Sequence, residues 1–117
     1  MPPRHQWRDP LQFALDTKAA SQVWQEKPGL WRFPSTENYA VTVQRDRVTY
    51  CSCPAGRTAG RCYHAAAVAL ALLEQWWAAE GLACDLSAID DAAVLLPSVL
   101  AFLPATAEEN APRRIAA

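Results

Sequence analysis

The chain has 117 residues, of which 51% are hydrophobic and 20% are charged, and its formal net charge is −1. This composition excludes a disordered chain and predicts one globular domain. Its core is small, so an additional cross-link or metal site would help to stabilise it. The opening sequence MPPRHQWRDP lacks a signal pattern, and the longest apolar run, AAAVALALL, stops at Glu74, too short for a bilayer. We therefore expect a cytoplasmic protein with no membrane partner.

The N-terminal part predicts one helix and a short strand. Asp9-Pro10 is typical of a helix start, and apolar residues at helical spacing continue the helix over about 10–25, until Lys27-Pro28-Gly29 ends it. A short strand follows around Trp31 and closes before Pro34.

The next segment predicts a β-hairpin. Residues 38–43 and 47–51 alternate between apolar and polar side chains, with the polar QRDR as a tight connection between them. Val48 and Tyr50 are expected on one face of the second strand, which delivers Cys51. The aromatic residues of these strands are expected in the core of the small sheet: Trp31, Phe33, Tyr39 and Tyr50.

The C-terminal half predicts helices. An alanine-rich helix begins near His64 and ends at Gly81, and only one of the adjacent Trp76 and Trp77 can face its core. Asp85 or Ser87 is expected to cap another helix through about Leu96, which Pro97 breaks. Cys84 is expected to be a small buried apolar residue. The domain is predicted to span 1–104, and 105–117 to be a flexible tail.

Three of the four cysteines and one of the two histidines fall within CSCPAGRTAGRCYH. In a reducing compartment such a cluster favours metal binding over disulfides. Cys51 and Cys53 point the same way from an extended strand end, while Cys62 and His64 stand where the helix begins. Together they make a closed Cys3His set, which is typical of one structural zinc ion and leaves no open position for catalysis.

The spacing C-x-C, eight residues, C-x-H, after a hairpin and before an apolar helix, resembles the SWIM zinc finger over about residues 38–75. The resemblance implies a module that binds DNA or proteins. The expected fold is therefore α+β: a small antiparallel sheet or hairpin with the Cys3His zinc site, an N-terminal helix and a helical C-terminal half.

Charge is distributed unevenly along the chain. Residues 32–64 carry five arginines against Glu37 and Asp46, or +3, whereas residues 65–117 carry seven acids against two arginines, or −5. Four arginines around the zinc site are the expected DNA phosphate contacts: Arg45, Arg47, Arg57 and Arg61. Arg57 and Arg61 are also expected to lower the pKa values of the neighbouring thiols.

The first functional hypothesis is therefore a non-enzymatic zinc protein that binds DNA, with no catalytic residues and no small-molecule substrate. The alternative is an adaptor that binds a protein partner through the acidic, Trp-containing helical half. A weaker alternative is a redox-responsive protein whose thiolates release zinc on oxidation.

Overall fold

A computed structural model describes residues 7–34, 38–58 and 61–104 of the chain. The predicted tail, 105–117, lies outside these residues. The predicted α+β class is confirmed, with helices at both ends of a four-stranded sheet. The elements are α1 (Arg8–Asp16), the 3-10 turn η2 (Ala19–Ser21), β1 (Trp24–Lys27), β2 (Leu30–Phe33), β3 (Tyr39–Gln44), β4 (Arg47–Cys51), α2 (Pro54–Thr58), α3 (Tyr63–Ala79), η3 (Leu86–Ala88), α4 (Ala92–Val99) and η4 (Leu100–Phe102).

The sheet is antiparallel throughout, in the order β1-β2-β3-β4. The predicted hairpin is formed by β3 and β4, and its two-residue turn has both central residues in the left-handed region, Arg45 at φ 53° and Asp46 at φ 61°. This is the conformation that matches the right-handed twist of the strands on either side.

The predicted helix over about 10–25 is wrong in its second half. Helix α1 ends at Asp16, and Lys18, at φ 55°, takes the left-handed conformation that terminates a helix. Residues 24–27 instead form β1, an exposed edge strand paired with β2. The sequence did not indicate β1, because none of its four side chains is buried and WQEK therefore shows no alternation of apolar and polar residues.

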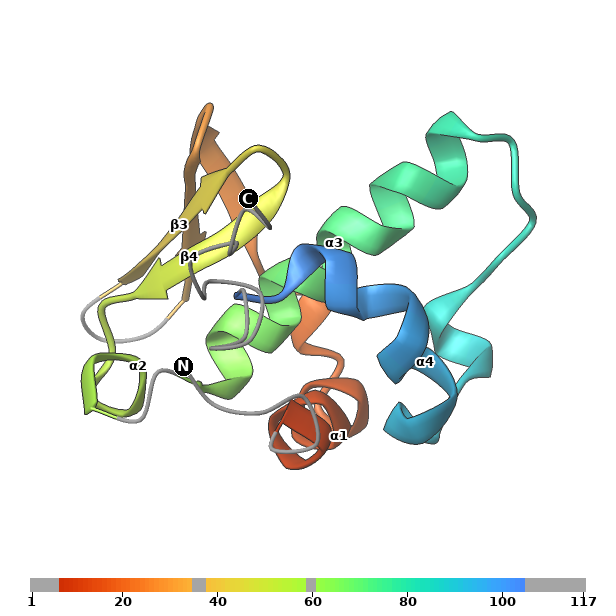
Figure 1. Ribbon diagram of the computed structural model, residues 1–117, viewed down its shortest axis with the longest axis horizontal. Helices are drawn as coiled ribbons and strands as arrows, with labels where there is room; N and C mark the ends of the chain where they lie inside the picture. The colour runs from red at the N-terminus through yellow and green to blue at the C-terminus, as the bar shows by residue number, and fades with distance from the viewer. Residues whose placement is uncertain (1–6, 35–37, 59–60, 105–117) are drawn as a thin grey trace, which may run out of the picture.

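Helix α3 runs through the centre of the molecule, with the sheet on one side and α1 and α4 on the other (Figure 1). Its first part is buried on every side, from His64 to Leu73, as expected of a helix that is apolar all round. Beyond Leu73 the helix emerges into solvent: Trp77 is buried against the core while Trp76 is 47% exposed. This agrees with the prediction that the two tryptophans cannot share one face.

The C-terminal segment differs from its prediction at three points. Asp91 caps α4 by accepting a hydrogen bond from the Ala93 N–H at 2.9 Å, whereas Asp85 caps only the short η3. Pro97 lies inside α4 and does not break it, because buried residues on both sides, Leu95 and Val99, hold the helix in place. Cys84 is exposed, not buried.

No helix among the described residues is long and apolar enough to cross a membrane.

The largest fully buried side chains belong to the helical layer and to the inner face of the sheet, and they form one continuous core: Trp7, Leu11, Leu70, Leu73, Leu103, Val41, Val48, Val68 and Val99.

Candidate metal centre

Four buried side chains converge where β4, α2 and α3 meet. Cys51 is the last residue of β4, Cys53 precedes α2, Cys62 precedes α3 and His64 lies in the first turn of α3. Their ligand atoms all lie within 4.8 Å of one another. Tetrahedral zinc with Zn–S of ~2.3 Å and Zn–N of ~2.0 Å places neighbouring ligand atoms about 3.5–3.8 Å apart. The separation of 3.9 Å between Cys51 Sγ and His64 Nδ1 therefore fits a shared ion.

A β-bulge places Cys51 on the inner face of the sheet. Val43 pairs with Val48 and Thr42 pairs with Tyr50, so that Thr49 is an extra residue in β4. The bulge shifts the alternation by one residue: Val48 and Cys51 are buried, while Tyr50 is 45% exposed. The prediction that Val48 and Tyr50 share a face, with Tyr50 in the core, is therefore wrong.

Ser52 fixes the chain between the first two ligands. Its backbone N–H donates to the Ala40 carbonyl at 2.9 Å, and its side-chain oxygen accepts from the Ala40 N–H at 2.9 Å. The β3–β4 ladder is thus continued by one residue past Cys51. This pairing directs the chain into the turn that carries Cys53.

Two cysteines hold equivalent positions before two helices. Cys53 Sγ accepts a hydrogen bond from the Gly56 N–H at 3.2 Å, and Cys62 Sγ accepts one from the Ala65 N–H at 3.3 Å. Each sulfur therefore acts as a helix N-cap, accepting from the third residue of the helix. Such amide donors and the positive end of a helix stabilise a thiolate, which is the form that binds zinc.

Gly56 makes room for this arrangement. A Cβ atom at this position would lie 2.5 Å from the Cys51 carbonyl oxygen and 2.9 Å from the Cys51 Cβ. Only glycine lets the first turn of α2 lie directly on the backbone of the first ligand. This role of Gly56 was not predicted, although Cys53-Pro54 is typical of a helix start, with proline in the first helical position.

The His64 ring is packed by aromatic rings on several sides. Its ring centroid lies 4.4 Å from that of Phe33, 5.0 Å from Tyr39 and 4.1 Å from Tyr63. These contacts hold the imidazole with its Nδ1 towards Cys51 Sγ. In many metal sites a hydrogen bond to the second ring nitrogen fixes the orientation of a ligating histidine. Here the packing of aromatic rings restricts rotation of the His64 ring.

Two of the thiols, those of Cys53 and Cys62, have raised pKa values, which favour the neutral form in the absence of a cation. Burial raises the pKa of Cys53, and a hydrogen bond with Cys51, followed by burial, raises the pKa of Cys62 to about 12. These pKa values are raised, not lowered as expected from Arg57 and Arg61, because burial and the neighbouring thiols dominate. A divalent cation reverses this balance, so the buried cluster is stable as a thiolate set only around a metal.

The structure places the four predicted DNA-contacting arginines in two pairs, near the two ends of β4. Arg45 is exposed in the hairpin turn, and Arg47 is half-buried with its Nε–H donating to the Ala101 carbonyl at 3.2 Å. At the other end, Arg57 is exposed in the last turn of α2 and Arg61 is half-buried immediately before Cys62.

Comparison with protein-family models gives a match to the SWIM zinc finger at residues 34–73. Comparison with curated proteins and with solved structures gives no match. The matched segment contains the hairpin, the four ligands, α2 and the buried part of α3, and it overlaps the module expected over about 38–75. The donor set and its geometry fit one structural zinc ion, held by Cys51, Cys53, Cys62 and His64. Residues 34–73 of this chain are therefore a SWIM zinc finger.

Proposed function

We propose that this zinc-binding chain is a non-enzymatic DNA-binding protein that contacts phosphates through arginines around the zinc site. The observation that carries the proposal is the separation of charge along the chain. Residues 32–64 have five arginines against Glu37 and Asp46, whereas residues 65–104 have five acids and no basic residue. A duplex would meet the basic segment and would repel the acidic one.

The arginines beside the zinc site give the first contact region. Arg57 is exposed on α2, which packs against the end of β4, and Arg61 directly precedes the ligand Cys62. Three thiolates and a neutral imidazole on Zn²⁺ sum to a charge of −1, which these two guanidinium groups more than offset. The zinc end of the molecule is therefore favourable for phosphate.

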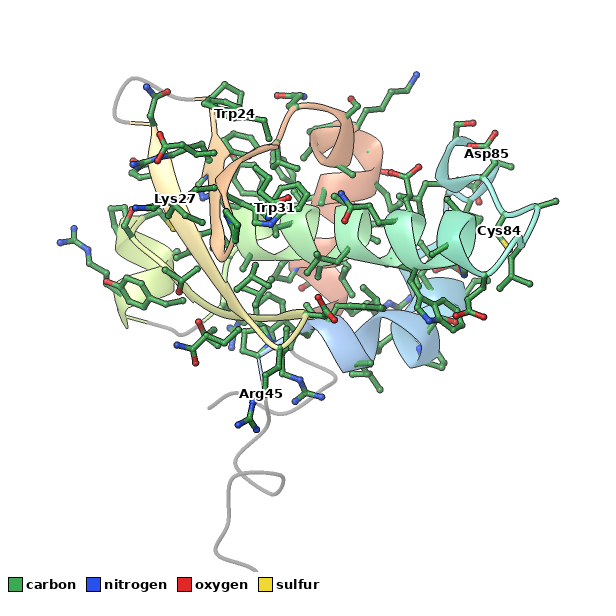
Figure 2. The ribbon with its side chains drawn as sticks, turned by 90° about the horizontal axis from the view of Figure 1, so that it is seen from above. Trp24, Lys27, Trp31, Arg45, Cys84 and Asp85 are labelled. Carbon is green, nitrogen blue, oxygen red and sulfur yellow. The ribbon has the colours of Figure 1, made fainter. Side chains whose placement is uncertain are left out.

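The hairpin turn gives the second contact region. β4 has five residues and spans about 17 Å, so Arg45 and Arg47 lie well apart from the zinc-side pair. Figure 2 shows Arg45 projecting from the end of the hairpin, away from the body of the molecule. Two separated pairs would contact different phosphates of one duplex, which gives salt-sensitive binding with little sequence preference.

The test is a titration of labelled duplex DNA with the zinc-loaded protein at two salt concentrations. Four phosphate contacts predict a log–log slope of affinity against salt near −3 to −4. Replacing Arg57 and Arg61 together with alanine should flatten the slope by about two, with zinc retained. The control Lys18→Asn removes a positive charge beyond the C-terminal end of α1 and should leave the slope unchanged, since asparagine tolerates the left-handed conformation of Lys18.

The DNA proposal fails if the wild-type chain does not bind DNA at low salt. It also fails if the arginine double variant binds equally well with the same slope. In either case the second candidate, a protein-interaction adaptor, takes its place. That candidate is favoured by the exposed apolar side chains of the acidic half, among them Trp76, Leu82 and Val94.

The redox alternative has the least structural support. The three zinc-site sulfurs belong to residues that are only 2% (Cys51), 2% (Cys53) and 6% (Cys62) exposed. Oxidation of a thiolate requires access of the oxidant to sulfur, and this burial restricts it.

A further inference from the structure

Two adjoining cavities lie along the emerging half of α3. The smaller one, of about 190 Å³, is walled by α1, α3 and the segment 85–89. The larger one, of about 510 Å³, is walled by α3, the β1–β2 region and the loop that follows α3. Ala20 and Glu74 belong to both cavities, so the two form one surface feature, which we call the α3 groove.

The walls of the α3 groove are mainly apolar. Leu70 and Leu86 line the smaller cavity, and Trp31 and Leu82 line the larger one. Leu82 is 46% exposed, which leaves apolar surface in contact with water. In Figure 2, Trp31 lies against α3, and Cys84 and Asp85 lie at the far end of the helix, so the residues that line the groove extend along α3 away from the zinc site.

The lining of the smaller cavity has a negative net charge, because it contains two carboxylates and one lysine. Glu74 and Asp85 both line the smaller cavity, and Lys18 on the same wall forms no ion pair with either. Partial desolvation of the carboxylate, followed by the charge of Asp85, raises the pKa of Glu74. A cationic side chain placed there would relieve the repulsion between the two carboxylates.

The sizes of the cavities indicate what would fit. The larger volume is within the range of roughly 300–1,000 Å³ that is usual for ligand sites, while the smaller is below it and suits a single long side chain. We propose that the α3 groove binds a short segment of a partner protein that carries an arginine or lysine beside large apolar residues. The cation would lie between Glu74 and Asp85, and the apolar side chains would pack against Trp31 and Leu82.

This site is separate from the proposed DNA contacts. Helix α3 has 17 residues and is therefore about 25 Å long, with the zinc site at its N-terminus and the α3 groove along its other half. The proposal therefore stands if DNA binding fails, and it then gives the adaptor alternative a defined surface.

The experiment is a selection of short random peptides displayed on phage against the zinc-loaded full chain. Selected peptides should combine arginine or lysine with leucine, phenylalanine or tryptophan. Glu74→Arg should weaken binding of a labelled selected peptide about tenfold or more, because it replaces the attracting carboxylate with a like charge. Leu82→Ser should weaken it about tenfold by removing apolar contact.

Matched controls distinguish binding in the α3 groove from general effects of charge and hydrophobicity. Glu80→Arg makes the same charge change near the end of α3, and Val94→Ser alters a side chain that is 65% exposed, yet neither residue lines the two cavities. Both control variants should bind the peptide like the wild type. Zinc content and circular dichroism of every variant establish that the fold is intact.

The proposal would be overturned if no peptide were enriched, if the enriched sequence were acidic, or if Glu74→Arg and Leu82→Ser left binding unchanged. Competition by duplex DNA for the selected peptide would also overturn it, since the groove would then belong to a nucleic-acid surface. Arg57→Ala with Arg61→Ala should leave peptide binding intact, and Glu74→Arg should not weaken DNA binding, so the failures of the two proposals are distinguishable.

Discussion

The two ends of α3 use opposite means to hold the chain together. At its N-terminus, four polar ligands are buried, and two sulfurs take the place of ordinary helix caps. Beyond Leu73 the buried side chain of α3 is the apolar Trp77, and the C-terminal segment adds the buried Leu86, Leu95 and Val99 to the same core. The acidic groups of α3 remain at the surface. The zinc end is held by four ligands that must surround one ion in a fixed geometry. The far end is held by many separate apolar contacts, and the α3 groove can remain open among them.

The largest effect is expected from loss of the metal. Chelation or Cys53→Ser should unfold the hairpin and α2, because structural zinc contributes on the order of 10–16 kcal/mol in small peptides, as much as the whole stability of many domains. The measurement is zinc content by elemental analysis, together with circular dichroism and thermal unfolding. Near-native spectra and an unchanged melting temperature in chelator would show that zinc is peripheral to the fold.

Leu95→Ala probes the apolar end. Leu95 is 3% exposed on α4, and truncation of such a core leucine costs about 2–5 kcal/mol. Urea unfolding in the presence of zinc should show this loss, while the folded protein still binds one zinc ion. The adjacent Val94→Ala, on the exposed side of α4, should change the unfolding free energy by less than about 0.5 kcal/mol. Loss of zinc from folded Leu95→Ala would mean that the two ends are not separate.

Gly56→Ala should weaken the zinc end by about 1–3 kcal/mol, because the new Cβ meets the Cys51 backbone, which cannot move without shifting a ligand. Competition with a zinc chelator measures the expected loss of affinity. Gly81→Ala is the control: its φ of 71° disfavours alanine, yet nothing lies within 4 Å of the added Cβ. It should lower stability by about 1–2 kcal/mol and leave zinc affinity unchanged. Equal zinc affinities in the two variants would contradict the role assigned to Gly56.

The smallest effect is expected from Cys84→Ser. This exposed cysteine lies beyond α3, outside the ligand cluster, so its substitution should leave zinc stoichiometry unchanged and alter stability by less than about 0.5 kcal/mol. A variant that lost its metal would show that the fourth ligand had been wrongly assigned.

The zinc centre was predictable because its information is local. Ligand identities, their spacing and the start of α3 all lie within one short stretch, and the hairpin that delivers Cys51 shows clear alternation. The β-bulge was not predictable, since Val48 and Tyr50 fit a regular strand equally well. Only pairing across the sheet shows that Thr49 is the extra residue, and that Cys51 faces inward for this reason.

The remaining errors arise where tertiary contacts override local preference. Lys18 ends α1 without a glycine, and Pro97 remains inside α4 because buried neighbours outweigh its missing N–H. The aromatic contacts of His64 involve β2, β3 and α3, and no sequence window includes them all. The sequence identifies the arginines as one basic segment. Their division into two pairs is seen only in the structure, where β4 separates Arg45 and Arg47 from Arg57 and Arg61.

The turn between β3 and β4 holds two residues in a conformation that asparagine and glycine adopt most easily, with Arg45 at φ 53° and Asp46 at φ 61°. Left-handed backbone costs an ordinary residue on the order of 1–2 kcal/mol. Replacing the pair with Asn-Gly would thus make the hairpin firmer while removing the guanidinium from its tip. Asp46 is removed together with Arg45, so the net charge of the turn stays the same while stability rises and the guanidinium is lost. A loss of DNA affinity in that variant could therefore be attributed neither to a loosened fold nor to a change in net charge.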